Sequence, residues 1–122
     1  MTTTPTITFT LKAEQEDTMV RGNAQDSGDA ALDKQVEDEI IARLDNGDVW
    51  AWCYIVVTAS CAGFTGRDTL GGCCYRDEAD FKQSGGYYKQ MQEEARADLL
   101  RNIENAVVKG AKAASLLAAL AA

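Results

Sequence analysis

The sequence predicts an α+β fold, a small antiparallel sheet with helices, in a single domain over residues 1–122. Three observations carry this prediction. Apolar residues alternate with threonine near the N-terminus, apolar residues recur at helical spacing in two long segments, and two β-forming segments flank a glycine-containing turn. The predicted order is strand, helix, a hairpin of two strands and a long helix. With 46% hydrophobic residues, the 122-residue chain can build one core.

The first strand is predicted over residues 6–11. Ile7, Phe9 and Leu11 share one face and threonines occupy the other, which is typical of a half-buried strand. A loop over residues 18–29 follows.

The first helix is predicted over residues 30–46. Ser27 or Asp29 is expected to cap its start, and Asn46-Gly47 supplies a left-handed end. Its apolar stripe recurs every four residues (Leu32, Val36, Ile40 and Leu44). The opposite, solvent-facing side is expected to be acidic (Asp33, Glu37, Asp38 and Glu39).

The hairpin is predicted from residues 49–61 and 69–75, which are rich in β-forming residues and separated by a turn over 63–66. Trp50 and Trp52 are expected on one face of the first of these strands, either as core or as a surface that stacks on a planar ring. Gly71-Gly72 in the second indicates a bulge or a close backbone approach.

A polar connection is expected over residues 77–86, before a long helix that begins near Tyr87. The apolar stripe of this helix recurs at helical spacing (Tyr88, Met91, Ala95, Leu99, Ile103 and Val107). Gly110 ends or kinks it. Residues 111–122 are predicted to form an alanine-rich helical tail, whose small side chains suit the packing of an assembly.

Composition excludes several classes of function. The net charge of −7 disfavours binding to DNA, RNA or anionic membranes. No apolar run is long enough to span a bilayer and no secretory signal is visible, so a cytoplasmic location with reduced thiols is expected. The chain has four cysteines and no histidine, which disfavours metal binding, nucleophilic catalysis and an enzyme in general. No cofactor is predicted.

The loop after the first strand contains Arg21-Gly22-Asn23. A guanidinium pairs with phosphate through two parallel bonds, the glycine lets backbone approach a ligand, and Asn23 offers a donor and an acceptor. The alternative is a turn whose arginine pairs with a neighbouring carboxylate. Two further arginines, Arg96 and Arg101, lie on the long helix and are either ligand-binding or solvated partners of glutamates.

The order of these motifs resembles a phage family, the first type of Thoeris anti-defence protein. The resemblance covers about residues 6–108 and rests on six segments (20–24, 27–29, the acidic helix, 48–53, 70–75 and 86–88). It implies a protein that binds and sequesters, without cleaving, the cyclic ADP-ribose isomers that TIR-domain enzymes make as immune signals in the infected bacterial cytoplasm. It also implies separate sites for cyclic di- or trinucleotides in a higher oligomer.

The resemblance also implies a ligand site. In that family the pocket lies between subunits of a homo-oligomer, for which a dimer or an assembly of dimers is expected. It uses an arginine after the first strand, a base-stacking aromatic residue and an arginine of the last helix. In this sequence Arg21 corresponds to the first, Tyr75 to the second, and Arg101, or else Arg96, to the third.

Two alternatives come from other classes of protein. A small acidic phage inhibitor, similar to an anti-CRISPR decoy, would use the acidic helix face to bind a host defence protein. A phosphodiesterase would degrade the same signal, but such enzymes normally require histidines or a metal cluster. The decoy predicts that Arg21 is dispensable, and sequestration predicts that it is essential.

Overall fold

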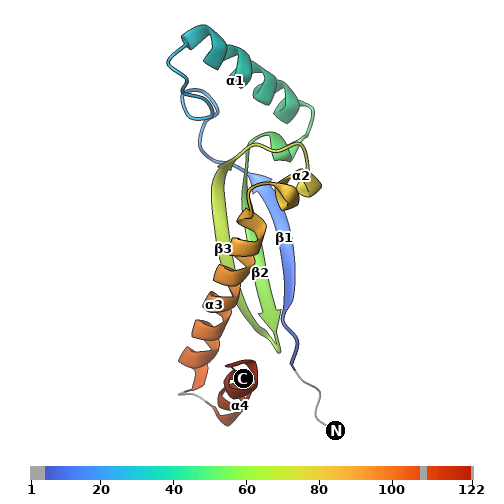
Figure 1. Ribbon diagram of the computed structural model, residues 1–122, viewed down its shortest axis with the longest axis vertical. Coiled ribbons are helices and arrows are strands. Elements are labelled where there is room, and N and C mark those ends of the chain that lie inside the picture. The colour runs from blue at the N-terminus through green and yellow to red at the C-terminus, as the bar shows by residue number, and fades with distance from the viewer. Residues whose placement is uncertain (1–4, 108–109, 122) are drawn as a thin grey trace. The chain divides into compact units, whose positions relative to one another are not determined.

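The predicted α+β class is confirmed. The computed structural model describes residues 5–107 and 110–121, so the predictions for residues 1–4, 108–109 and Ala122 lie outside the described chain. The elements are β1 (Thr8–Gln15), α1 (Ala30–Asp45), the 3₁₀ turn η1 (Val49–Ala51), β2 (Cys53–Cys61), β3 (Phe64–Cys73), α2 (Glu78–Gln83), α3 (Tyr87–Val107) and α4 (Ala111–Ala121) (Figure 1).

The sheet has three strands in the order β1-β2-β3, with β2 in the centre. A hydrogen bond joins Thr8 to Ser60 and another joins Glu16 to Trp52, so β1 and β2 run antiparallel. Ala62 and Gly63, with φ angles of 51° and 87°, form the tight turn between β2 and β3. Two consecutive left-handed residues match the twist of a hairpin, which explains the glycine.

Contacts group the chain into two compact units. Unit 1 comprises Met1–Leu11, Val57–Asp68 and Tyr88–Ala122, and unit 2 comprises Lys12–Val56 and Thr69–Tyr87.

In unit 1, α3 packs against the edge strand β3. A Cβ on Gly66 would lie 2.1 Å from the Leu99 nitrogen, so only glycine permits this approach. The Asp98 carboxylate accepts from the Arg67 N–H at 2.9 Å, and the Asn102 amide donates to the Thr65 carbonyl at 2.7 Å. Because β3 is an edge strand, these bonds occupy backbone groups that another strand could otherwise pair with.

The buried stripe of α3 agrees with the predicted spacing. Its buried members are Met91, Ala95, Leu99 and Ile103. The predicted helical tail is also present as α4, and Arg96 Nη2 donates to the Leu120 carbonyl at 3.1 Å. Arg96 therefore satisfies one of the carbonyls that the end of a helix leaves unpaired.

In unit 2, α1 begins where the sequence predicts. Asp29 is the N-cap, and its side chain accepts from the N–H groups of Ala31 and Leu32. Gly47 has φ of 83° just after the helix. The helix packs on a small core (Val20, Ile40, Ala51 and Trp52). Leu32, which the stripe predicts to be buried, is 45% exposed because it belongs to the first turn, beyond this core.

Three local predictions are wrong. The turn expected over residues 63–66 is shorter, because Ala62 and Gly63 alone reverse the chain and β3 begins at Phe64. Trp50 and Trp52 do not share a strand face, because the chain forms η1 here and β2 begins only at Cys53. Asp48 causes this turn by accepting from the Trp50 N–H at 3.2 Å. The polar connection over residues 77–86 contains the helix α2, where Asp77 caps the start and Phe81 is fully buried.

Candidate functional site

The Arg21 loop of unit 2 is a tight turn. The N–H groups of Asn23 and Ala24 both donate to the Val20 carbonyl, at 3.1 and 3.0 Å. Gly22 has φ of 80°, a left-handed conformation that favours glycine. The Asn23 amide donates to the carbonyls of Met19 at 2.9 Å and Arg21 at 3.3 Å. Asn23 therefore braces the turn that presents Arg21.

The guanidinium of Arg21 pairs with two carboxylates of α1. It donates a hydrogen bond to Asp38 and lies 3.5 Å from Glu37. The bond to Asp38 raises the pKa of Arg21, and the same bond lowers the pKa of Asp38 from its ordinary 3.8. Pairing with neighbouring carboxylates, the alternative interpretation of this motif, is thus present in the free protein. The Arg21 side chain nevertheless remains 44% exposed.

The prediction that the acidic side of α1 faces solvent is wrong at Glu37. It is only 7% exposed, and its carboxylate accepts from the Gly22 N–H at 2.7 Å. The loop folds over this position of α1 because the left-handed Gly22 turns its N–H toward the carboxylate. Helical spacing alone assigns Glu37 to the exposed face. It cannot reveal that Glu37 is buried, because the loop, and not the helix, covers this side chain.

A second feature of unit 2 is a depression of about 400 Å³ at the end of β3. It is lined by one continuous segment and one residue of α3 (Leu70, Gly71, Gly72, Cys73, Cys74, Tyr75 and Tyr87). Gly72 has φ of 64° and its N–H donates to Glu16 at 2.9 Å, which agrees with a local irregularity at the glycine pair. A Cβ there would lie 3.6 Å from the Trp52 ring.

The Tyr75 ring is half-buried in this depression. It packs edge-on against Phe81, with ring centroids 5.1 Å apart, and burial raises the pKa of its phenol. Tyr87 is 46% exposed on the same depression. Two aromatic rings beside bare glycine backbone form a surface on which a planar base can stack.

Arg43 is the arginine that sequence reasoning missed. Its Nε donates to Asp48 at 2.8 Å, its Nη2 donates to the Tyr75 carbonyl at 2.6 Å, and its Nη1 lies 3.7 Å from Cys74 Sγ. It fixes the segment that carries Tyr75 against the end of α1. The signal in the sequence is weak, a basic residue in the last turn of a helix. Of its partners only Asp48 is near in sequence, whereas Cys74 and Tyr75 lie 31 and 32 residues further on.

Two buried cysteines of unit 2, Cys53 and Cys73, are poor nucleophiles. Burial raises the pKa of the Cys53 thiol to about 12 and that of Cys73 to about 11, so both stay protonated at neutral pH. Cys74 is exposed at the depression. Cys73 is the last residue of β3 and is buried, whereas Cys74 follows the strand and is exposed.

Arg96 and Arg101, the two helical candidates, belong to unit 1. Arg96 donates to the Leu120 carbonyl, and Arg101 pairs with Asp98 at 3.4 Å while remaining largely exposed. The structure therefore joins Arg21 and Asn23 in one turn, places Tyr75 in the depression of unit 2, and gives both helical arginines partners within unit 1.

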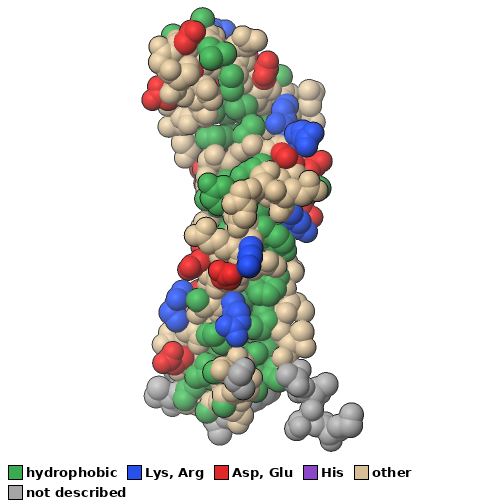
Figure 2. Space-filling view, in the orientation of Figure 1, with side chains coloured by type: hydrophobic (Ala, Val, Ile, Leu, Met, Phe, Trp, Pro, Cys, Tyr) green, Lys and Arg blue, Asp and Glu red, His purple; other side chains and the backbone are tan. Residues whose placement is uncertain are grey.

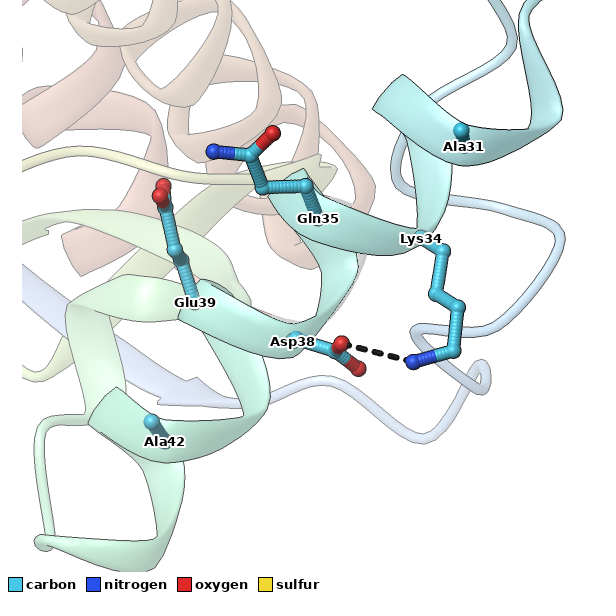
Figure 3. A pocket seen from close by; sticks show the side chains of 6 residues that line it. All are labelled: Ala31, Lys34, Gln35, Asp38, Glu39 and Ala42. Carbon is cyan, nitrogen blue, oxygen red and sulfur yellow. Dashed lines mark hydrogen bonds and ion pairs between the residues drawn. The ribbon is translucent and has the colours of Figure 1, made fainter.

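The outer side of α1 carries a shallow depression of about 460 Å³ (Figure 3). Its lining comes from this one helix (Ala31, Lys34, Gln35, Asp38, Glu39 and Ala42). Lys34 reaches Asp38 at 2.9 Å, and the Glu39 side chain points away from that pair. A single helix cannot enclose a ligand, so this surface suits a contact better than a pocket.

The visible surface of the described chain carries charges of both signs. On the face drawn in Figure 2, lysines and arginines of the described chain are spread among acidic side chains and form no continuous patch.

Within residues 5–107 and 110–121, no helix combines the length and apolar character needed to cross a membrane. The chain matches no family model, no curated protein and no solved structure.

Proposed function

We propose that this protein binds a small phosphate-bearing nucleotide, such as a cyclic ADP-ribose isomer, and sequesters it without cleaving it. The observation that carries the proposal is the depression lined by Gly71, Gly72, Tyr75 and Tyr87. Its volume of about 400 Å³ falls in the range of small-molecule sites. The rings supply a stacking surface for a base, and the glycines leave backbone accessible to polar groups.

Arg21 is the proposed partner of the phosphates. A tight turn already orders it, and 44% of its side chain is open to solvent. A preordered guanidinium loses less entropy when it binds an anion than a freely moving one. By resemblance, we propose that a homo-oligomer, either a dimer or an assembly of dimers, completes the site with Arg101 or Arg96. The same resemblance suggests cyclic di- or trinucleotides as second ligands, and the bacterial cytoplasm as the location.

Sequestration, rather than cleavage, is supported by the chemistry of the chain. It contains no histidine to act as a general base, and the pKa values of Cys53 and Cys73 keep these thiols protonated. A ligand that is bound tightly and released intact fits this set of residues.

The alternative of an acidic decoy for a defence protein has weaker support. That role requires carboxylates free to contact a partner. Asp33 instead accepts from Ser27 at 2.6 Å, Glu37 is buried, and Asp38 pairs with Arg21 and Lys34. Much of the acidic face is thus engaged within unit 2.

Calorimetry with cyclic ADP-ribose isomers tests the proposal. We expect one isomer to bind tightly to the wild type and to be recovered intact after the complex is denatured. Arg21→Ala should weaken binding at least about tenfold, the value of one charge-assisted bond. Arg76→Ala is the matched control. The Arg76 side chain also belongs to unit 2 and is 85% exposed, and its substitution by alanine removes the same charge. Equal losses in both variants, breakdown products or no binding would contradict the proposal.

A further inference from the structure

Arg21 belongs to a cluster of four alternating charges. Lys34 pairs with Asp38 at 2.9 Å, Asp38 pairs with Arg21, and Arg21 lies 3.5 Å from Glu37. The two carboxylates are neighbours in sequence and on α1, yet their environments differ. Glu37 is buried, whereas the Asp38 side chain is 44% exposed.

The buried carboxylate holds the turn itself. Glu37 accepts from the Gly22 N–H at 2.7 Å in addition to facing Arg21. An incoming anion could replace Glu37 only by opening the turn, because the same carboxylate satisfies loop backbone. Removing it would leave a part-buried N–H without its acceptor. Glu37 is therefore a fixed anchor for Arg21.

The exposed carboxylate is replaceable. Asp38 holds the other side of the guanidinium, and in the described chain its partners are the side chains of Arg21 and Lys34 rather than backbone of the loop. If Arg21 turns to a ligand, Asp38 keeps Lys34 as its counter-ion. Exposed ion pairs are weak, so a ligand with more than one negative charge can compete with this one.

We propose that Asp38 is a built-in competitor for the anion-binding side of Arg21, while Glu37 positions that arginine. This inference rests on the proposed function, since it takes Arg21 to bind phosphate. In the free protein Asp38 pairs with the anion-binding side of the Arg21 guanidinium. A ligand therefore needs more than one negative charge to displace Asp38. A diphosphate takes the place of Asp38, and the Glu37 contact stays. The two neighbouring carboxylates then act on binding in opposite directions.

The test compares three variants that each remove one negative charge: Asp38→Asn, Glu37→Gln and Glu39→Gln. Glu39→Gln is the matched control, because it lies on the same helix and its side chain points away from the Lys34–Asp38 pair (Figure 3). The probes are inorganic pyrophosphate, followed through the Arg21 Nε–Hε resonance, and the cyclic ADP-ribose isomers, followed by calorimetry.

We expect Asp38→Asn to bind pyrophosphate about two- to fivefold more tightly than Glu39→Gln, which is the range for an exposed ion pair. Glu37→Gln should bind more weakly than Glu39→Gln. Equal affinities of Asp38→Asn and Glu39→Gln would overturn the inference, as would an Arg21 resonance that pyrophosphate leaves unmoved in both. If pyrophosphate gives the expected order but no cyclic ADP-ribose isomer binds, the competition stands and the proposed ligand fails.

Discussion

The Arg21 turn of unit 2 and the β3–α3 contact of unit 1 are held by the same type of hydrogen bond, but their surroundings differ. In each, a carboxylate of a helix accepts from a backbone N–H of another segment. Glu37 accepts from Gly22 at 2.7 Å, and Asp98 accepts from Arg67 at 2.9 Å. Each region also contains a glycine that matters, but for opposite reasons. A Cβ on Gly66 would meet Leu99 at 2.1 Å, whereas a Cβ on Gly22 would have no described atom within 4 Å.

The difference separates a scaffold from an adjustable site. At Gly66, close packing fixes the geometry, so the helix and the strand cannot change their spacing without loss of core contacts. At Gly22, charge and backbone conformation fix the turn and space around it remains open. Regions of the second kind can exchange partners, which is what a binding loop requires.

The largest effect should come from Gly66→Ala. We expect the free energy of unfolding to fall by about 3 kcal/mol, because the added methyl group overlaps backbone atoms of α3 that cannot move aside. Gly22→Ala is the comparison, with an expected loss of about 1 kcal/mol for a left-handed alanine without a clash. Urea denaturation measures both. Similar losses would mean that packing does not distinguish the two regions.

Removal of the Glu37 anchor should rank second. Glu37→Ala leaves the part-buried Gly22 N–H without its acceptor, which should cost about 2 kcal/mol. Glu39→Ala, at an exposed position two residues further along α1, is expected to change stability by less than about 0.5 kcal/mol. Chemical denaturation of both variants gives the values. A loss at Glu39 as large as that at Glu37 would contradict the burial difference between them.

The corresponding carboxylate of unit 1 should matter less. We expect Asp98→Ala to lower the free energy of unfolding by about 1 kcal/mol, because Gly66 and the buried stripe still hold α3 against β3. Exchange of the Arg67 amide hydrogen should accelerate as its acceptor is lost. Glu104→Ala, an exposed position of the same helix, serves as the control. A loss at Asp98 larger than that at Glu37 would reverse the proposed contrast.

The smallest expected effect is on the pH dependence of the Arg21–Asp38 pair. Arg21 and Lys34 lower the pKa of Asp38 below 3.8, so the stability that this carboxylate contributes is present above that pH. It is lost as the pH falls through the lowered pKa. The difference in urea midpoint between wild type and Asp38→Asn should therefore be constant from about pH 5 to pH 7 and shrink only below about pH 4. If the difference in urea midpoint already declined at about pH 6, a group other than Asp38 would be responsible for the pH dependence.

The sequence by itself determined the longer helices and the three strands, although not η1 or α2. Alternation, helical stripes and the caps at Asp29 and Gly47 are local patterns, and they predicted α1, α3, the hairpin and the α+β class because nearby residues decide such features. The residue types themselves pointed to Arg21, Arg96 and Arg101 as candidates for binding an anion. The resemblance supplied the identity of the ligand and the roles of these arginines and of Tyr75, and these remain predictions.

Tertiary structure decided which side chains meet. Glu37 turned inward, Arg43 reached Tyr75, Phe81 became core and Gly66 allowed α3 to approach β3. Each of these contacts joins residues at least fifteen positions apart, or depends on a neighbour that periodicity does not encode. A repeat in the sequence specifies which face of a helix is apolar. It cannot specify that a loop will fold over the polar face and bury a carboxylate there, because that outcome depends on the non-local pairing of charge and backbone.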